Sequence, residues 1–264
     1  MHRIDAAAHV AEYAAACRRG HVPPGATPVV VLMLTRNNAA YWRNTFGTVY
    51  DTIHQTWPQG VQWFILENDS TDDTVAVLHA WAAAKHNLQV SSAHLPATQP
   101  LVPRCNERTQ RLAWLRNALL GWAWPALGPA TQVVLLDTSV TFTTATLRVL
   151  SALVHTRQVS MACANTCERD HPTHYYDTYS LGQTTCLWRE CRRCRGPTSC
   201  QYRRPTDWVR VPSAFGGLAL LLGSALPGPW WQASHNECEH VSFCAQLPGP
   251  VGIALAAPAV WTAQ

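Results

Sequence analysis

The sequence has few charged side chains and almost no lysine. Charged residues make up 14% of its 264 residues, and Lys85 is the only lysine among 20 basic residues. The formal net charge is only +4, which argues against a general nucleic-acid-binding polycation. A GC-rich genome explains the bias toward arginine more simply than a need for arginine's bidentate contacts to carboxylates and phosphates. We therefore expect no nucleic-acid partner.

Long apolar runs are also missing. The longest, 214–222, contains two glycines and is too short to cross a bilayer. Residues 1–20 have the pattern of a short helix interrupted by charged side chains, without the unbroken apolar stretch of a signal peptide. We therefore expect no transmembrane segment and a cytoplasmic location. In that compartment we expect the ten cysteines to be thiols or metal ligands more often than disulfides.

Internal repeats and low-complexity tracts are absent as well, and the apolar runs occur singly between helical patterns. This rhythm predicts an α/β domain with a mixed, largely parallel sheet flanked by helices. We expect an N-terminal helical extension over 1–26 and one domain over 27–264, with a Cys- and Arg-rich insertion at about 184–206. Strands are predicted at 29–34, 61–67, 133–137 and 159–164, helices at 71–85, 108–124 and 144–155, and further apolar segments at 209–222 and 251–261.

The segment 67–74, ENDSTDDT, lies where a predicted strand turns into a helix. Ser70 is a good N-cap residue, and Asp73 would then occupy the third helical position. Capping does not explain Glu67 and Asp69, which place carboxylates at the carboxyl end of the strand. Ligands bind at that edge in open α/β sheets.

A second polar motif, Asp137-Thr138-Ser139, follows the apolar run 133–136. A carboxylate at the end of a buried strand suits a divalent cation and the phosphates that the cation neutralises. The same three residues are equally typical of a simple turn that ends a strand. The motif alone leaves both interpretations open.

Taken together, the motifs resemble those of the GT-A glycosyltransferases related to the capsule-associated mannosyltransferases, including relatives in large DNA viruses. The resemblance covers roughly residues 27–260, and its motifs follow one another in the family's order. They are Thr35-Arg36-Asn37-Asn38, the turn at 67–74, RTQRLAWLRN at 108–117, LLDTSV at 135–140, MACA at 161–164, YYDTY at 175–179, FGGLALL at 215–221 and ECEHV at 237–241.

This resemblance implies transfer of a sugar from a UDP- or GDP-linked donor to a hydroxyl of a glycan or protein. Asp137 matches the first acid of the family's Asp-x-Asp motif, which holds Mn²⁺ or Mg²⁺, and Ser139 stands at the second acid. A hydroxyl is a poorer ligand than a carboxylate, so metal binding would be weak or would rely on another ligand or on arginine. The residues that resemble the nucleoside pocket are Thr35, Arg36, Glu67 and Asp69.

Three arginines on the predicted helix 108–124 are candidates for the donor diphosphate: Arg108, Arg111 and Arg116. Any that reaches the cleft could clamp the diphosphate bidentately, whereas the alternative for each is a solvated helix face. Gly216 and Gly217 would leave space for the sugar or the acceptor, because only glycine lets the backbone approach so closely.

The proton acceptor of the reaction is expected near the C-terminus. Glu239 matches the first member of an acidic pair in inverting relatives, and His240 stands where an Asp is usual, so Glu237, Glu239 and His240 are all candidates for the base. His240 could instead be a metal ligand or a core histidine. Asp177 lies among tyrosines that can stack on a sugar, although these tyrosines could simply pack in a β-region.

Four cysteines, Cys186, Cys191, Cys194 and Cys200, have the spacing C-x4-C-x2-C-x5-C. They could form a structural zinc site, with reduced thiols or a local disulfide as alternatives. Two other functions therefore stay open: a catalytically inactive relative that binds sugar or protein, suggested by Ser139, and a zinc-stabilised interaction module on an α/β domain. A sugar nucleotidylyltransferase is disfavoured, since no Gly-rich phosphate loop follows the first predicted strand.

Overall fold

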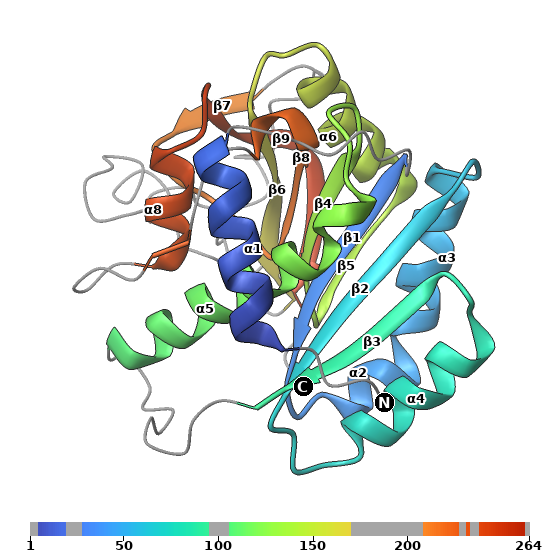
Figure 1. Ribbon diagram of the computed structural model, residues 1–264. Helices are drawn as coiled ribbons and strands as arrows, with labels where there is room; N and C mark the ends of the chain where they lie inside the picture. The colour runs from blue at the N-terminus through green and yellow to red at the C-terminus, as the bar shows by residue number, and fades with distance from the viewer. Residues whose placement is uncertain are drawn as a thin grey trace.

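The structure is a computed structural model that describes residues 5–19, 28–94, 106–169, 208–226, 231–232 and 238–261. Its strands are β1 (Val29–Thr35), β2 (Val61–Asn68), β3 (Leu88–Ala93), β4 (Gln132–Asp137), β5 (Val140–Phe142), β6 (Met161–Glu168), β7 (Trp208–Val211), β8 (Leu218–Leu222) and β9 (Val251–Trp261). They form one sheet in the order β3-β2-β1-β4-β8-β6-β9-β5, with β7 paired to β9 (Figure 1).

The sheet is mixed and largely parallel, which confirms the predicted fold class. Strands β3, β2, β1 and β4 are parallel to one another. Strand β8 runs antiparallel between β4 and β6, and β6 is parallel to β9. The carboxyl ends of β1, β2, β3 and β4 therefore meet at one edge of the sheet, the lower edge in Figure 1.

Helices cover both faces of the sheet. They are α1 (Ala6–Arg19), α2 (Ala39–Asn44), α3 (Phe46–Thr56), α4 (Thr74–Ala84), α5 (Asn106–Ala123), α6 (Thr144–His155) and α8 (Glu239–Ala245), with short 3-10 turns at Trp124–Ala126 and Gly223–Ala225. Helices α5 and α8 pack on one face, and α2, α3, α4 and α6 on the other. In the part of the chain that the structure describes, none of these helices is both long and apolar enough to cross a membrane.

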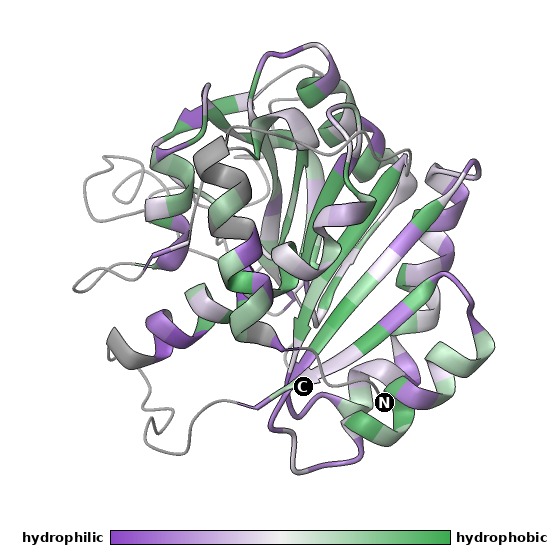
Figure 2. Ribbon diagram, in the orientation of Figure 1, coloured by the Kyte–Doolittle hydropathy of each residue, from purple (hydrophilic) through white to green (hydrophobic). Residues whose placement is uncertain are grey.

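The double coverage explains the unbroken apolar sequence of β1. Val30 and Leu32 point into the core beneath α5, while Val31 and Met33 point into the core beneath α2 and α3. A strand covered on both faces has no solvent side and needs no polar alternation. Figure 2 accordingly shows β1 and β4 as strongly hydrophobic and the loops at the lower edge as hydrophilic.

The N-terminal helix α1 packs against α5 and crosses in front of it in Figure 1. At Gly121 of α5 a Cβ atom would overlap the backbone carbonyl of His9, so the two helices approach too closely for any side chain there. Helix α1 thus packs directly on the domain. The boundary at residue 26 stays a prediction, and the insertion at about 184–206 lies outside the described residues.

One local prediction is wrong. The helix expected at 71–85 begins at Thr74, and Asp73 rather than Ser70 stands at its N-cap position. The Ser70 hydroxyl instead accepts a hydrogen bond from the backbone N–H of Asn37, at 2.9 Å. Asp72 accepts from the N–H of Thr74 at 3.0 Å and from that of Ala39 at 3.1 Å. Ser70 is therefore bonded to the neighbouring loop, and Asp72 rather than Ser70 accepts from the N–H of the first helical residue.

Candidate active site

The polar ends of three parallel strands lie side by side. Thr35 of β1 is in register with Glu67 of β2, and Leu34 of β1 is in register with Asp137 of β4. The two polar motifs predicted from the sequence therefore flank the same strand. This is the edge at which open α/β sheets bind ligands.

The loops that leave these strands have unusual backbone conformations and are joined to one another. Asn37, Asp69 and Ser139 have φ values of 50°, 49° and 71°, in the left-handed region. The Asn37 side chain accepts from the N–H of Thr71 at 2.7 Å, and the Asn38 side chain donates to the Thr138 hydroxyl at 2.6 Å. Such strained conformations persist where surrounding contacts over-determine them, and they cluster at functional sites.

Two of the predicted donor-pocket residues, Glu67 and Thr35, support this edge from inside. Glu67 is buried, and its carboxylate accepts from the N–H of Ser70 at 2.6 Å and from the hydroxyl of Ser92 at 2.5 Å. The hydroxyl of Thr35 accepts from the indole N–H of Trp42 at 3.0 Å. The structure therefore uses both side chains to hold the loops in place.

The other two predicted pocket residues, Asp69 and Arg36, reach the surface. The Asp69 side chain is 32% exposed and pairs with His94, Oδ1 to Nδ1, at 2.8 Å. Arg36 is partly exposed, and its buried Nε has no hydrogen-bond partner among the described residues. These two side chains can therefore meet a ligand beyond the ends of β1 and β2.

Asp137 ends β4 and contacts the glycine turn before β8. Its backbone N–H donates to the carbonyl of Gly217 at 2.8 Å. Gly217 has a φ of 72°, and a Cβ atom there would lie 2.6 Å from Cγ2 of Val140. The preceding Gly216, with a φ of 66°, accepts a hydrogen bond from the Thr166 hydroxyl at 2.5 Å. Close packing within the protein therefore already requires glycine at 217.

Arg116 connects this turn to α8. Its Nε donates to Oε1 of Glu239 at 3.1 Å, and its Nη2 lies 3.6 Å from Oδ1 of Asp137. Its guanidinium carbon lies 4.9 Å from the ring centre of Phe215, at cation–π distance. We call Arg116, Asp137 and Glu239 the Arg116 cluster. It joins residues of α5, β4 and α8, and 123 positions separate Arg116 from Glu239.

The three predicted arginines of α5 differ in their surroundings. The Arg116 side chain is 11% exposed and charge-paired. Arg111 is buried, and its Nε has no hydrogen-bond partner within the described ranges. Arg108 is exposed. Of the three, only Arg116 is shown to contact Asp137 and Glu239.

Glu239 and His240 are buried next to Arg116. Burial would raise the pKa of Glu239, but its pKa is lowered by the neighbouring His240 and Arg116 and by the hydrogen bond from Arg116. Burial lowers the pKa of His240 to about 3, and the nearby charge of Arg116 acts in the same direction. His240 is therefore neutral at neutral pH, and Arg116 supplies the positive charge that keeps Glu239 ionised.

Several residues around Glu239 and His240 were not predicted. The Cys238 thiol donates to Oε2 of Glu239 at 3.4 Å. The His240 ring stacks on Phe215 and accepts at Nδ1 from the indole of Trp231 at 3.5 Å. This leaves the proton on Nε2, which lies 3.7 Å from Oε1 of Glu239.

Asn117 fixes the backbone of Trp231. Its side chain donates to the Trp231 carbonyl at 2.9 Å and accepts from the Trp231 N–H at 3.2 Å. Asn117 follows Arg116 directly on α5 and is buried. The one signal in the sequence was a polar residue beside a candidate arginine on the predicted helix, and neither its burial nor its partner could be read from the sequence.

Several predicted residues lie outside the part of the chain that the structure describes. These are Asp177, Glu237 and the four cysteines Cys186, Cys191, Cys194 and Cys200, so their roles stay predictions. Within the described residues, no three or more His, Cys, Asp or Glu side chains form a group that could hold a metal ion. The predicted metal ligand Ser139 is buried, with 7% of its surface exposed.

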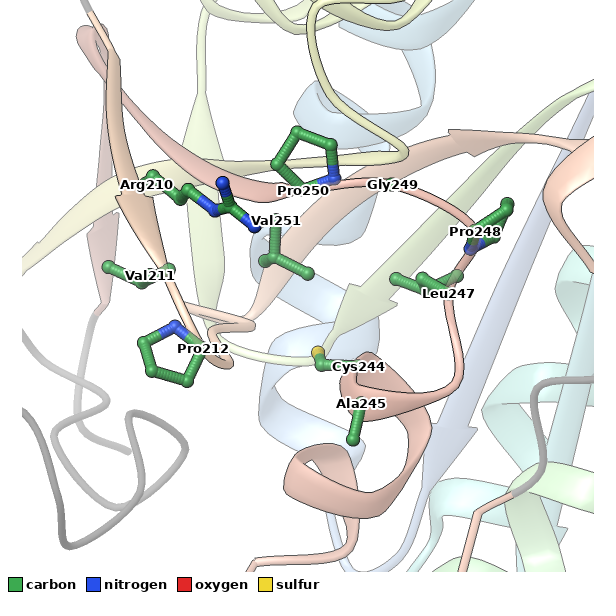
Figure 3. A pocket seen from close by; sticks show the side chains of 10 residues that line it. All are labelled: Arg210, Val211, Pro212, Cys244, Ala245, Leu247, Pro248, Gly249, Pro250 and Val251. Atoms are coloured by element: carbon green, nitrogen blue, oxygen red, sulfur yellow. The ribbon is translucent and has the colours of Figure 1, made fainter.

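A separate hollow of about 660 Å³ lies at the opposite end of α8 (Figure 3). Val251 in its wall is the first residue of β9 and pairs with Met161, the first residue of β6. The hollow is therefore at the amino end of these strands, away from Asp137. Among the described residues that line it, Arg210 is the one that carries a charge. It is distinct from the site at the Arg116 cluster.

Comparison with known proteins identifies the family. Residues 29–242 match the family model described as cryptococcal mannosyltransferase 1. The chain belongs to this mannosyltransferase family. The resemblance to this glycosyltransferase family that the sequence motifs predicted is thereby confirmed. Sequence comparison with curated proteins gives no match.

Solved GT-A glycosyltransferases share the fold of this family member. The mannosyltransferase PcManGT from Pyrobaculum calidifontis, solved with GDP-Man and Mn²⁺, has a TM-score of 0.51 and 14% identity over 96% of this chain and 65% of its own. GalNAc-T7, solved with UDP, GalNAc and Mn²⁺, has a TM-score of 0.54 and 12% identity over 90% and 44%. S. aureus TarS 1–349, solved with UDP-GlcNAc, has a TM-score of 0.51 and 10% identity over 90% and 59%. The chain thus spans about three fifths of TarS 1–349, and the likeness shows the fold.

Proposed function

We propose that the protein transfers a sugar from a UDP- or GDP-linked donor to a hydroxyl of a glycan or glycoprotein acceptor. The observation that carries the proposal is the Arg116 cluster, which places a permanent cation beside Asp137 at the ligand-binding edge of a glycosyltransferase fold. The nucleotide-sugar complexes of TarS and PcManGT support a donor of this class.

We place the donor along the carboxyl ends of β1, β2 and β4. Arg36 and Asp69 are the surface groups beyond β1 and β2, and we assign them to the nucleoside. We assign Asp137 and Arg116 to the diphosphate and the sugar. The Asp137 side chain is 34% exposed and can reach a ligand. A guanidinium is well suited to phosphate oxygens because its donors match them in pairs.

In the reaction, the acceptor oxygen forms a bond to the anomeric carbon while the bond from that carbon to the diphosphate breaks. The nucleoside diphosphate leaves, and the acceptor proton passes to a base. Glu239 is buried and already binds Arg116 and Cys238, so we assign it and His240 to positioning Arg116. For an inverting reaction, Glu237 and Asp177 are then the proposed bases.

The described residues do not fit a divalent metal site. Mn²⁺ in the GalNAc-T7 and PcManGT structures supports a divalent cation in this fold. In this chain, however, the predicted ligands are one carboxylate, Asp137, that faces a guanidinium, and a buried serine, Ser139. Mn²⁺ and Mg²⁺ prefer several hard oxygen ligands. We therefore assign no reaction step to a metal. The four cysteines predicted for a zinc site lie outside the described residues, so the structural zinc ion stays a prediction.

Thermal-shift titration of the protein with UDP, GDP and their common sugars, with and without Mn²⁺, tests the proposal. A nucleotide that binds the native state stabilises it by about 2.7 kcal/mol at a hundredfold excess over its Kd. A shift with one nucleotide, together with donor hydrolysis or transfer, is expected. Binding without either reaction across a broad acceptor panel would instead indicate an inactive sugar-binding relative, which Ser139 in place of the second acid already suggests.

A further inference from the structure

We propose that Arg116 is the built-in cation of the donor site and that the donor diphosphate binds without a divalent metal ion. The inference rests on the proposed function, because it concerns the same donor. The proposed function does not specify whether a metal ion is needed, because a nucleotide-sugar enzyme can work with or without one. The metal dependence of donor binding can therefore be measured separately.

The charge of Arg116 is fixed in place. Burial would lower the pKa of Arg116, but Asp137 and Glu239 together raise it, so the guanidinium stays protonated. Glu239 holds the Nε edge from the buried side, and Phe215 lies against the guanidinium face. A cation that is already oriented loses little conformational freedom when a phosphate binds.

The remaining edge of Arg116 is suited to a diphosphate. A guanidinium has five N–H donors, and the hydrogen bond to Glu239 uses the one on Nε. The Nη2 atom is 3.6 Å from Oδ1 of Asp137, which is longer than a hydrogen bond. The terminal nitrogens thus lie toward the more exposed carboxylate of the cluster, where a phosphate can accept from them in pairs.

The same arrangement disfavours a metal ion at Asp137. A divalent cation bound there would lie close to the guanidinium charge, and like charges repel strongly in a partly buried site. Ser139 is too buried to offer its hydroxyl readily, and within the described residues no other group of acids, histidines or cysteines completes a site. Arg116 therefore occupies the role that the family's second acid and its metal would fill.

A purely structural role for Arg116 does not explain why its side chain extends toward Asp137. Its neighbour Asn117 already ties α5 to the Trp231 segment through two buried hydrogen bonds. These hydrogen bonds are between neutral groups, so joining the two segments does not require the charge of Arg116. A structural ion pair with Glu239 also would not require Arg116 to extend toward Asp137, the partly exposed end of β4.

Isothermal titration calorimetry on the full chain tests the inference with UDP, GDP, UMP and GMP, in EDTA and in Mn²⁺. We expect the Kd of the preferred diphosphate to differ by less than about threefold between EDTA and Mn²⁺. Arg116→Gln should weaken the diphosphate about tenfold or more, as expected for charge-assisted hydrogen bonds, and should leave the monophosphate nearly unchanged. Arg148→Gln, an exposed arginine on α6, is the matched control and should change neither.

The possible results separate the two proposals. Binding that requires Mn²⁺ would overturn this inference and leave the proposed function standing, whereas no nucleotide binding in either condition would refute the proposed function. Because Arg116→Gln leaves Glu239 without its cation, its melting temperature is measured first. If that variant does not fold, Arg116→Gln/Glu239→Gln, which buries no unpaired charge, takes its place. Unchanged diphosphate affinity in the folded variant would overturn the inference.

Discussion

Arg116 lies between two carboxylates of unequal exposure, with Glu239 3% exposed and Asp137 34% exposed. The buried carboxylate accepts the hydrogen bond from Nε, and the exposed one faces Nη2. Glu239 therefore fixes the orientation of Arg116, while Asp137 borders the surface where a ligand arrives.

Replacing Glu239 should destabilise the protein and weaken donor binding together. Glu239→Gln removes the buried negative charge that pairs with Arg116, and breaking a buried ion pair from one side costs about 3 kcal/mol. Urea unfolding measures this loss, and titration with the preferred nucleoside diphosphate measures the weaker binding. Glu12→Gln, at an exposed glutamate of α1, should change stability by less than about 0.5 kcal/mol. Equal stability of the two variants would contradict a buried anchoring role for Glu239.

The buried His240 should make stability fall as the pH is lowered from neutral. Its pKa is about 3 in the folded protein, against an ordinary value of 6.5. Between these values the unfolded chain binds a proton that the folded protein does not, so stability is full above about pH 6.5 and declines by about 1.4 kcal/mol per pH unit below it.

Urea unfolding at pH 5, 6 and 7 measures this decline. His54 also has a lowered pKa, because of its burial and the nearby Lys85, and adds a slope of the same sign. The comparison with His240→Gln therefore isolates the contribution of His240, and the variant should have the shallower slope. Parallel slopes would mean that His240 is protonated in the folded protein, against its burial beside Arg116.

The central strands were predictable from the sequence because β1, β2 and β4 are buried on both faces and so appear as unbroken apolar runs. The polar residues at their ends followed from the same pattern. The pairing of Arg116 with Glu239 was not predictable, since Arg108, Arg111 and Arg116 have the same chemistry and only tertiary burial distinguishes them. Ser70 was misassigned for a related reason: its partner, Asn37, comes from a different loop.

The turn before β8 should tolerate no side chain at Gly217. Gly217→Ala would place Cβ against Cγ2 of Val140 in a left-handed backbone, and we expect a loss of about 2 kcal/mol in the free energy of unfolding. Gly47→Ala is the matched control, because Gly47 lies within α3 and a Cβ there would make an ordinary contact, 3.6 Å from Cη2 of Trp81. That variant should be neutral or stabilised by up to about 1 kcal/mol. Similar unfolding midpoints for the two variants would show that the turn can relax.

Asp137→Asn should reduce catalysis far more than stability. The side chain is 34% exposed and lies 3.6 Å from Nη2 of Arg116, so the fold should lose less than about 1 kcal/mol. An amide presents no negative charge to the sugar, where positive charge develops at the anomeric carbon as its bond to the donor diphosphate breaks. We expect kcat/KM for donor hydrolysis or transfer to fall about a hundredfold, as for the loss of one oriented electrostatic contact. Steady-state kinetics with the preferred nucleotide sugar, alongside a melting curve, measure both effects. Full activity in a folded Asp137→Asn protein would remove Asp137 from the donor site and would place the reaction elsewhere along the edge formed by β1 and β2.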